Sequence, residues 1–178
     1  EYSGRSVSMC PMGKDSFGPA VIHEGGGHGF GRLLDEYRYY AAELPSDDKN
    51  SIKSWRSKDP YYGYNLDLTG DRNKVHWAHY FDRPGYEAVS MYEGGCLYEY
   101  GVWRPEYISC MEDNRPYYNA PSREAIVRRI MRASGKTFNM EDFISKDKIR
   151  SEKGAPQTRT DYVTEAFVPF APPIRVER

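Results

Sequence analysis

Two histidines and a glutamate lie together near the start of the chain, in the segment HEGGGHGFGRLLDEY that runs from His23 to Tyr37. These residue types suit a catalytic zinc ion, which takes three protein ligands and keeps a fourth position open for water. The usual pattern, H-E-x-x-H, places the two histidines four residues apart on one helix face, with a glutamate general base beside the first. Here His28 follows His23 by five residues, and Glu24 occupies the position of the base.

The extra residue decides whether the two histidines can share a metal ion. On a regular α-helix, residues four apart differ by about 40° in direction, whereas residues five apart differ by about 140°. A π-bulge widens one turn to five residues and restores the pairing. Between Glu24 and His28 lie Gly25, Gly26 and Gly27, which lack Cβ atoms and tolerate the distortion. We therefore expect a bulged helix in which His23 and His28 bind one ion.

A third ligand must come from later in the chain. If the helix continued, Asp35 would lie about 10 Å along the axis from His28, too far to reach the same ion. Gly29 and Gly31 allow the chain to leave the helix through positive φ and fold back, which makes Asp35 the first candidate. The competing candidates are the other two histidines, His76 and His79, followed by Glu36.

The elements around this segment are predicted from periodicity and turn residues. We expect a helix over Ala20–His28, ended by the glycines after His28, and a second over Arg32–Leu44, closed by Pro45. Residues 46–71 are polar and rich in tyrosine, which predicts an irregular segment. Residues 92–111 carry turn signals at their glycines, which predict a hairpin or loops that line a cleft.

Two helices are predicted in the last third of the chain. Ser122 is a suitable N-cap for REAIVRRIMRAS, with Gly135 as its C-terminal stop, and Asn139 opens a shorter helix. At the two ends of the chain, residues 4–10 alternate as an edge strand does, and the proline-rich last 28 residues predict extended chain.

The bulk composition limits the classes of partner. A length of 178 residues fits one domain over residues 1–178, and 25 basic against 26 acidic residues leave no electrostatic footprint for nucleic acid. No apolar run approaches the roughly 18 residues that a membrane-spanning helix needs. Cys10, Cys96 and Cys110 lack the spacing of a structural metal site; either Cys96 and Cys110 form a disulfide or the thiols are free.

The tract HGFGRLLDEY, together with YEGG, GVWRP, ISCM and PSREAI further on, resembles the IgA-peptidase family of secreted bacterial zinc metallopeptidases. The resemblance extends from about Ser8 to about Ile130. Members of that family are metzincin-like, with a zinc-binding helix, a glycine turn and a methionine-containing turn beneath the metal. The resemblance implies an α+β, metzincin-like catalytic domain, mostly helical with irregular tyrosine-rich loops, located in the periplasm, at the cell surface or outside a bacterium.

The resemblance also implies roles for individual residues. It implies zinc ligation by His23, His28 and Asp35, general-base catalysis by Glu24, and a turn methionine at Met111 that packs under the zinc without binding it. Such domains place a sheet and helices before the zinc helix, whereas only 22 residues precede His23. We therefore expect a C-terminal fragment of a longer protein that lacks part of its N-terminal sheet.

The leading functional expectation is a zinc-dependent endopeptidase that cleaves protein or peptide substrates with metal-activated water and Glu24 as general base. Three residues before Met111 are candidate oxyanion donors, and the sequence does not choose among them: Tyr98, Tyr100 and Arg104. One alternative is an inactive metal-containing module that binds protein or glycan through its tyrosine-rich loops. Another is a zinc hydrolase, as in dipeptidyl-peptidase-like enzymes, in which His79 or a later glutamate replaces Asp35.

Overall fold

The helix that carries the two histidines has widened turns throughout its last ten residues. The computed structural model describes Cys10 and residues 17–151, and in it helix α1 (Phe17–Val21) continues directly into the π-helix η1 (Ile22–Gly31). The predicted bulge is therefore confirmed, and it extends over a whole element instead of one turn. Since a π-helix brings residues five apart onto one face, His23 and His28 share a side of η1.

The chain leaves this helix at Arg32 and not at the preceding glycines. Arg32 has a left-handed conformation (φ 56°), and its amide donates to the carbonyl of Gly27. Gly29 and Gly31 lie within η1 and neither has a positive φ in the structure, so the prediction that they turn the chain was wrong. Gly31 serves packing instead, because an added Cβ would lie 3.2 Å from Cγ1 of Ile126.

Residues 32–44 form a loop and a strand, so the helix predicted over Arg32–Leu44 was wrong. Strand β1 (Arg38–Glu43) lies at the edge of a three-stranded sheet of order β1-β3-β2. It runs parallel to β3 (Leu97–Arg104), which pairs antiparallel with β2 (Tyr92–Gly95). The predicted hairpin is thus confirmed, and pairing with a distant strand overrides the helical spacing of residues 33–44.

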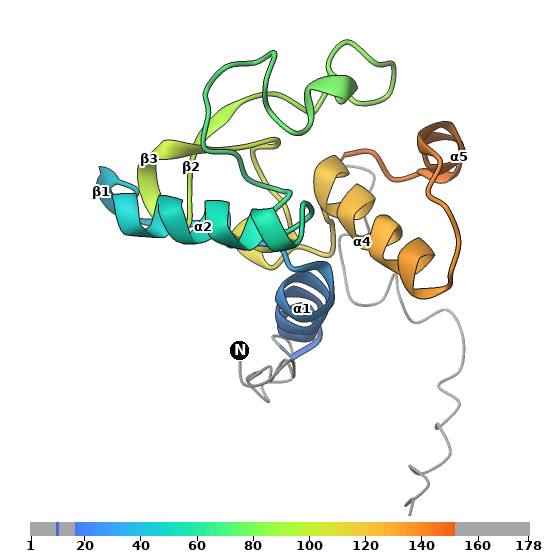
Figure 1. The fold of residues 1–178 in the computed structure, drawn as a ribbon, viewed down its shortest axis with the longest axis horizontal. Coiled ribbons are helices and arrows are strands. Elements are labelled where there is room, and N and C mark those ends of the chain that lie inside the picture. Colours follow the sequence, from blue (N-terminus) through green and yellow to red (C-terminus); the bar gives the residue numbers. More distant parts are fainter. Residues whose placement is uncertain (1–9, 11–16, 152–178) are drawn as a thin grey trace, which may run out of the picture.

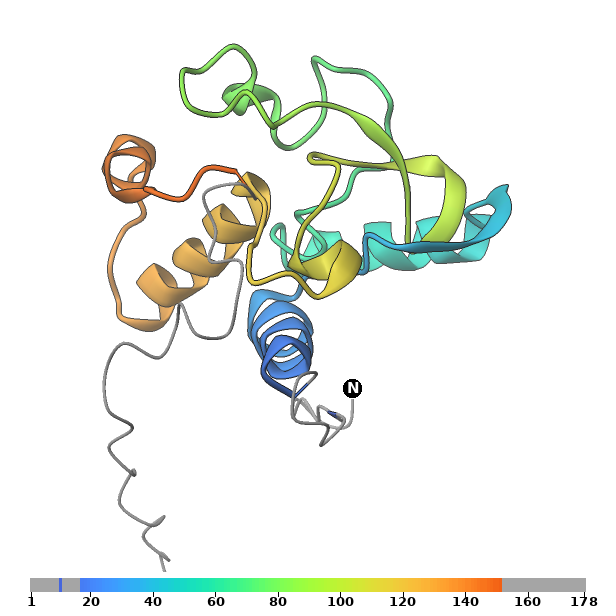
Figure 2. The ribbon, with the colours of Figure 1, turned by 180° about the vertical axis from the view of Figure 1, so that it is seen from behind.

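The first half of the segment predicted as irregular is a helix, α2 (Ser46–Lys58). Asp47 and Asp48 in its first turn and Lys58 in its last complement the helix dipole. Its one buried residue, Ile52, packs on a cluster formed by Leu44, Leu66 and Val102, which fixes α2 against the sheet. Figure 1 shows α2 crossing in front of the strands, and Figure 2 shows the same arrangement from behind.

Of the remaining helical elements, those of residues 110–113 and 120–133 contact η1. The rest of the described chain contains a short 3₁₀ turn η2 (Ala78–Tyr80) and helices α3 (Cys110–Asp113), α4 (Ala120–Ala133) and α5 (Met140–Lys146). The N-cap of α4 is Asn119 instead of Ser122, because its side chain accepts from the amide of Ser122 and the helix starts three residues earlier than predicted.

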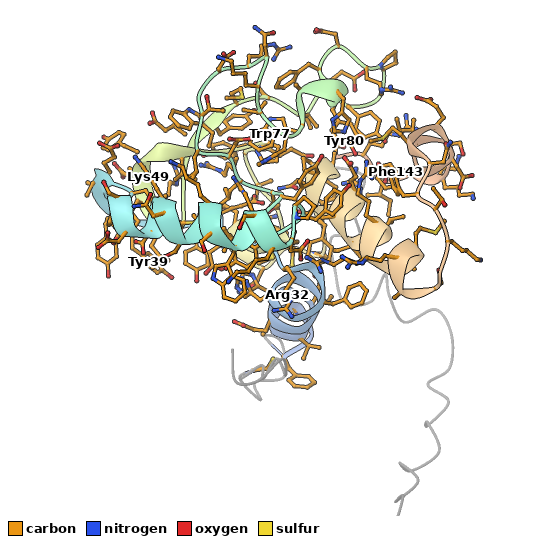
Figure 3. The ribbon with its side chains drawn as sticks, viewed as in Figure 1. Arg32, Tyr39, Lys49, Trp77, Tyr80 and Phe143 are labelled. Carbon is orange, nitrogen blue, oxygen red and sulfur yellow. The ribbon has the colours of Figure 1, made fainter. Side chains whose placement is uncertain are left out.

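Two of the helix-end predictions hold. The predicted start of α5 at Asn139 is confirmed, and Gly135 (φ 69°) follows the end of α4 as expected. The largest core cluster includes Trp77, Tyr80 and Phe143, which are labelled in Figure 3.

Over the described residues the fold is α+β, which confirms that part of the predicted class. In that part of the chain no helix has the length and apolar character needed to cross a bilayer. The thiols of Cys10, Cys96 and Cys110 are all free. The edge strand predicted over residues 4–10 and the extended chain predicted after residue 150 lie outside the described residues, apart from Cys10 and Ser151.

Candidate metal centre

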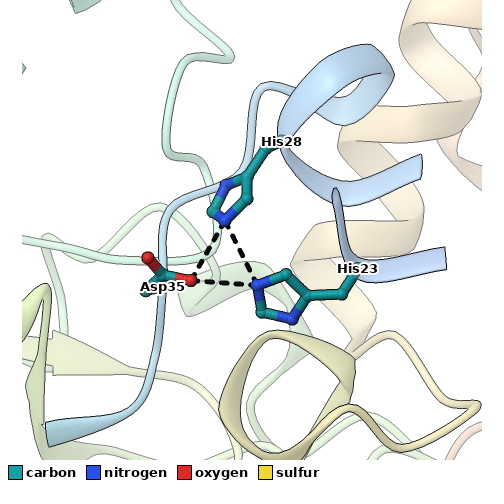
Figure 4. Close-up of side chains that lie close together, drawn as sticks. All are labelled: His23, His28 and Asp35. Atoms are coloured by element: carbon teal, nitrogen blue, oxygen red, sulfur yellow. Dashed lines mark hydrogen bonds and ion pairs between the residues drawn. The ribbon is translucent and has the colours of Figure 1, made fainter. Parts of the chain in front are cut away.

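His23, His28 and Asp35 converge on one point (Figure 4). The Nε2 atoms of the two histidines are 3.2 Å apart, and each lies 3.0 Å from Oδ1 of Asp35. A tetrahedral zinc ion with bonds of about 2.0–2.1 Å holds its ligand atoms roughly 3.3 Å from one another. The triangle therefore has the size that such an ion requires.

The hydrogen bonds on the far side of each ring fix which nitrogen points into this triangle. Nδ1 of His23 donates to the carbonyl of Cys110 at 2.9 Å, and Nδ1 of His28 donates to the carbonyl of Leu33 at 2.8 Å. In a neutral imidazole with Nδ1 protonated, Nε2 is an acceptor. Two ring lone pairs and a carboxylate oxygen therefore face each other without a proton between them, unless a ring becomes cationic. The site is built for a positive charge, and backbone carbonyls orient the rings as they do in protein metal sites.

The pKa values reflect the same demand for positive charge. Burial alone would lower the pKa of His23, yet its hydrogen bonds to Asp35 and to the Cys110 carbonyl raise it above the ordinary value. Burial likewise opposes protonation of His28, whose pKa is raised by the hydrogen bond and charge of Asp35 and, to a smaller extent, by the charge of Glu24. Against the effect of burial, the two histidines hold the pKa of Asp35 well below its usual range.

One side of the triangle is open. The side chain of His23 is 6% exposed, whereas His28 and Asp35 are 31% and 24% exposed. Structural zinc sites close the ion with four protein ligands, while catalytic sites use three and leave room for water. Among the described residues only these three form a cluster of metal-ligating side chains, so the geometry matches the catalytic type.

Helix α3 forms the floor beneath η1. Met111 is fully buried and lies against Gly27, where an added Cβ would strike its sulfur. The preceding residue, Cys110, supplies the carbonyl that orients His23. Tyr118 donates from its hydroxyl to the carbonyl of Ile22 at 2.5 Å and fixes the start of η1. The glycine run thus serves close packing as well as the widened turn.

The segment after η1 is held so that the Asp35 side chain returns to the histidines. The carbonyl of Asp35 accepts from the amide of Cys96 at 2.8 Å, and the amide of Glu36 donates to the carbonyl of Met111 at 2.8 Å. Tyr37 acts to lower the pKa of the Asp35 carboxyl and stacks on the His23 ring at 6.3 Å between centroids. Both the hairpin turn and α3 therefore position the third member of the triangle.

Glu36 is buried behind this segment and stays outside the triangle. Its carboxylate accepts from Asn65 and Asn119 at one oxygen and from Ser109 at the other, at 2.6–2.7 Å. Burial raises the pKa of Glu36 to about 7, although these donors act to lower it. The side chain ties the Asp35 segment to α3 and α4, which is a structural role.

The competing third-ligand candidates lie elsewhere. His76 pairs with Asp67 at 2.9 Å, and His79 pairs with the buried carboxylate of Glu124 at 2.9 Å. Glu124 is also bound by Arg128, so it offers no ligand from α4. The structure therefore brings Asp35, and none of these residues, to the two histidines.

The three candidate oxyanion donors differ in their access to the centre. Arg104 is buried, and its Nη1 donates to the backbone carbonyls of Glu93 and Gly94. Tyr100 is 50% exposed on β3. Tyr98 alone shares a pocket with His28 and Asp35.

Comparisons with protein-family models and with curated proteins give no match to this chain. The geometry of the centre is therefore the basis for a functional assignment.

Sequence reasoning missed the residues that support the triangle. Tyr37 follows Asp35 by two positions, and residues two apart in an extended segment point to the same side, a signal that is present in DEY. No sequence signal marks the backbone carbonyls of Leu33 and Cys110, because every residue has a backbone carbonyl. The placement of Glu24 remains a prediction from its position next to His23; the structure shows it half-buried on η1.

Proposed function

We propose that this protein is a zinc-dependent endopeptidase with a metzincin-like catalytic centre. The observation that carries the proposal is the convergence of two imidazole lone pairs and one carboxylate oxygen on a partly open point, with Glu24 directly after the first histidine. The fully buried Met111 beneath η1 supports the metzincin-like comparison, because it occupies the floor of the metal-binding helix.

The chain supplies the ligands, their orientation and a base. A zinc ion held by His23, His28 and Asp35 would supply Lewis acidity, polarising the scissile carbonyl and lowering the pKa of a water molecule to about 7. The Cys110 and Leu33 carbonyls keep both rings in the tautomer that presents Nε2. Glu24 accepts the proton of the attacking water and returns it to the nitrogen of the leaving amine.

Replacing Glu24 with glutamine separates metal binding from catalysis. We expect Glu24→Gln to keep stoichiometric zinc and to lose peptide cleavage by at least about a hundredfold, the usual contribution of a positioned general base. Glu141→Gln is the matched control, because Glu141 is 74% exposed on α5 and lies in no metal-ligating cluster of the described chain. Retained zinc with retained cleavage in Glu24→Gln would refute the assignment of the base.

A second function, a metal-holding module that binds without hydrolysis, is favoured by exposed tyrosines on the sheet. Tyr39 and Tyr40 on β1 and Tyr100 on β3 are 74%, 53% and 50% exposed. Aromatic side chains that are exposed together are common in recognition surfaces. Stoichiometric zinc with no cleavage of a broad peptide library would select this function over hydrolysis.

A further inference from the structure

A hollow opens directly beside the candidate metal centre. It lies between α2 and the turn that joins β2 to β3, and His28 and Asp35 form part of its lining. Its cavity volume is about 360 Å³, which is near the lower end of the about 300–1,000 Å³ typical of small-molecule pockets. The hollow thus has room for one large side chain and shares two residues with the metal centre.

One face of α2 forms the outer wall. Asp48, Ser51, Ile52 and Trp55 line the hollow, and their spacing places them on one side of the helix. Ile52 is 6% exposed and belongs to the core, whereas Trp55 is 40% exposed and stacks on Tyr62 at 5.7 Å between ring centroids. The base of the wall is therefore fixed by the buried Ile52, and the aromatic rings of Trp55 and Tyr62 form its outer edge.

The opposite wall is the turn between β2 and β3, where Cys96 and Leu97 both have positive φ, 48° and 74°. Such conformations are costly for residues other than glycine and persist where the surroundings determine them. Here the two amides donate to the carbonyls of Asp35 and Tyr37, at 2.8 and 3.1 Å. The same strained turn therefore holds the Asp35 segment and forms the wall of the hollow.

The chemistry of the lining, as well as the size of the hollow, determines which side chains can bind there. Most of it is apolar or aromatic, and besides Asp35 its one carboxylate is Asp48, which is exposed in the first turn of α2. The nearby guanidinium of Arg56 donates to the backbone carbonyls of residues 62, 63 and 66 and is not part of the lining. A large apolar side chain gains from burial here, whereas an acidic one meets the charge of Asp48.

We propose that this hollow is the specificity subsite of the enzyme and takes a large apolar side chain, aromatic ones first, from one of the two residues that flank the scissile bond. The assignment rests on the proposed peptidase function. Because His28 and Asp35 contribute to the lining, the side chain in the hollow belongs to a residue next to the bond that is cleaved.

The test is a set of peptides in which each residue flanking the scissile bond is varied in turn, cleaved by the zinc-loaded protein. At one of the two positions we expect kcat/KM to be at least about tenfold higher for phenylalanine than for alanine, and lowest for aspartate and glutamate. Ser51→Trp fills the hollow and should abolish the preference for phenylalanine, whereas Ser57→Trp, on the opposite face of α2, should keep it.

The charge of Asp48 has its own matched control. Asp48→Asn should relieve the discrimination against acidic side chains by a few-fold, while Asp47→Asn, one residue earlier in the same helical turn, should leave it unchanged. Cleavage without preference at either position would overturn the subsite and leave the peptidase proposal standing. No cleavage of any peptide by zinc-loaded protein would overturn the peptidase proposal and the subsite with it.

Discussion

Gly27 is packed closely between η1 and Met111 in helix α3 beneath it. An added Cβ there would strike the sulfur of Met111 and lie 3.0 Å from its Cε, and Met111 is fully buried. Gly27→Ala therefore overpacks the core, which costs about 1–3 kcal/mol, while the helical preference of alanine returns roughly 0.5–1 kcal/mol. We expect a net loss of about 0.5–2 kcal/mol in the free energy of unfolding.

The same change should weaken zinc binding. Pushing η1 away from α3 stretches the hydrogen bond from His23 to the Cys110 carbonyl, which is 2.9 Å long. Loss of such an orienting partner lowers metal affinity by about 10–100-fold, and we expect an effect near the lower value. Denaturant unfolding of metal-free protein measures the stability without a contribution from bound zinc, and competition with a chelator measures the affinity.

Gly25→Ala is the control for this substitution, because an added Cβ at Gly25 has no atom within 4 Å. It should leave zinc affinity unchanged and raise stability by up to about 1 kcal/mol. Combining Gly27→Ala with Met111→Ala, which removes Sδ and Cε, should cost less than the sum of the two single substitutions. Equal stability and equal zinc affinity in Gly27→Ala and Gly25→Ala would show that close packing at Gly27 has no effect on either.

Two further predictions concern the network behind the metal centre. Burial raises the pKa of Glu36 to about 7 from an ordinary 4.5. The buried, protonated carboxyl of Glu36 therefore contributes fully to stability below pH 4.5, and this contribution is lost as the pH rises through about 7. The unfolding free energy of metal-free wild type should therefore fall relative to Glu36→Gln by up to about 1.4 kcal/mol per pH unit over that window, and parallel pH profiles would contradict this. Asn119→Ala should cost about 2 kcal/mol or more in thermal or denaturant unfolding, because Asn119 caps α4 and also donates to Glu36. Asn139→Ala removes only the cap of α5 and should cost about 1 kcal/mol, and equal losses would show that the bond to Glu36 adds nothing.

The histidine pairing was predictable because it is a local property of the chain. Two histidines five residues apart, with three glycines directly before the second, share one face of a helix only if a turn is widened. The same holds for the cap at Asn139, where the residue type itself sets the backbone conformation. Gly94 and Gly95 signalled the β2–β3 hairpin, although the residues that make its turn are Cys96 and Leu97.

The elements after η1 were not predictable in the same way. Residues 33–44 show helical spacing, yet β1 forms because β3, nearly sixty residues later, offers a parallel partner for Arg38 at Leu97. Helix α2 buries only Ile52, so it shows no apolar periodicity; the acidic first turn and basic last turn were the available signals. The return of Asp35 depends on Arg32 and on a distant turn at Cys96, contacts that no local pattern contains.

The central claim is that His23, His28 and Asp35 hold one zinc ion. The most direct test is metal analysis of purified wild type, Asp35→Ala and His79→Ala, since His79 pairs with Glu124 and lies outside the triangle. We expect one zinc per chain in wild type and in His79→Ala, and loss of zinc in Asp35→Ala. Zinc retained in Asp35→Ala, lost in His79→Ala, or replaced by iron in wild type would contradict the account.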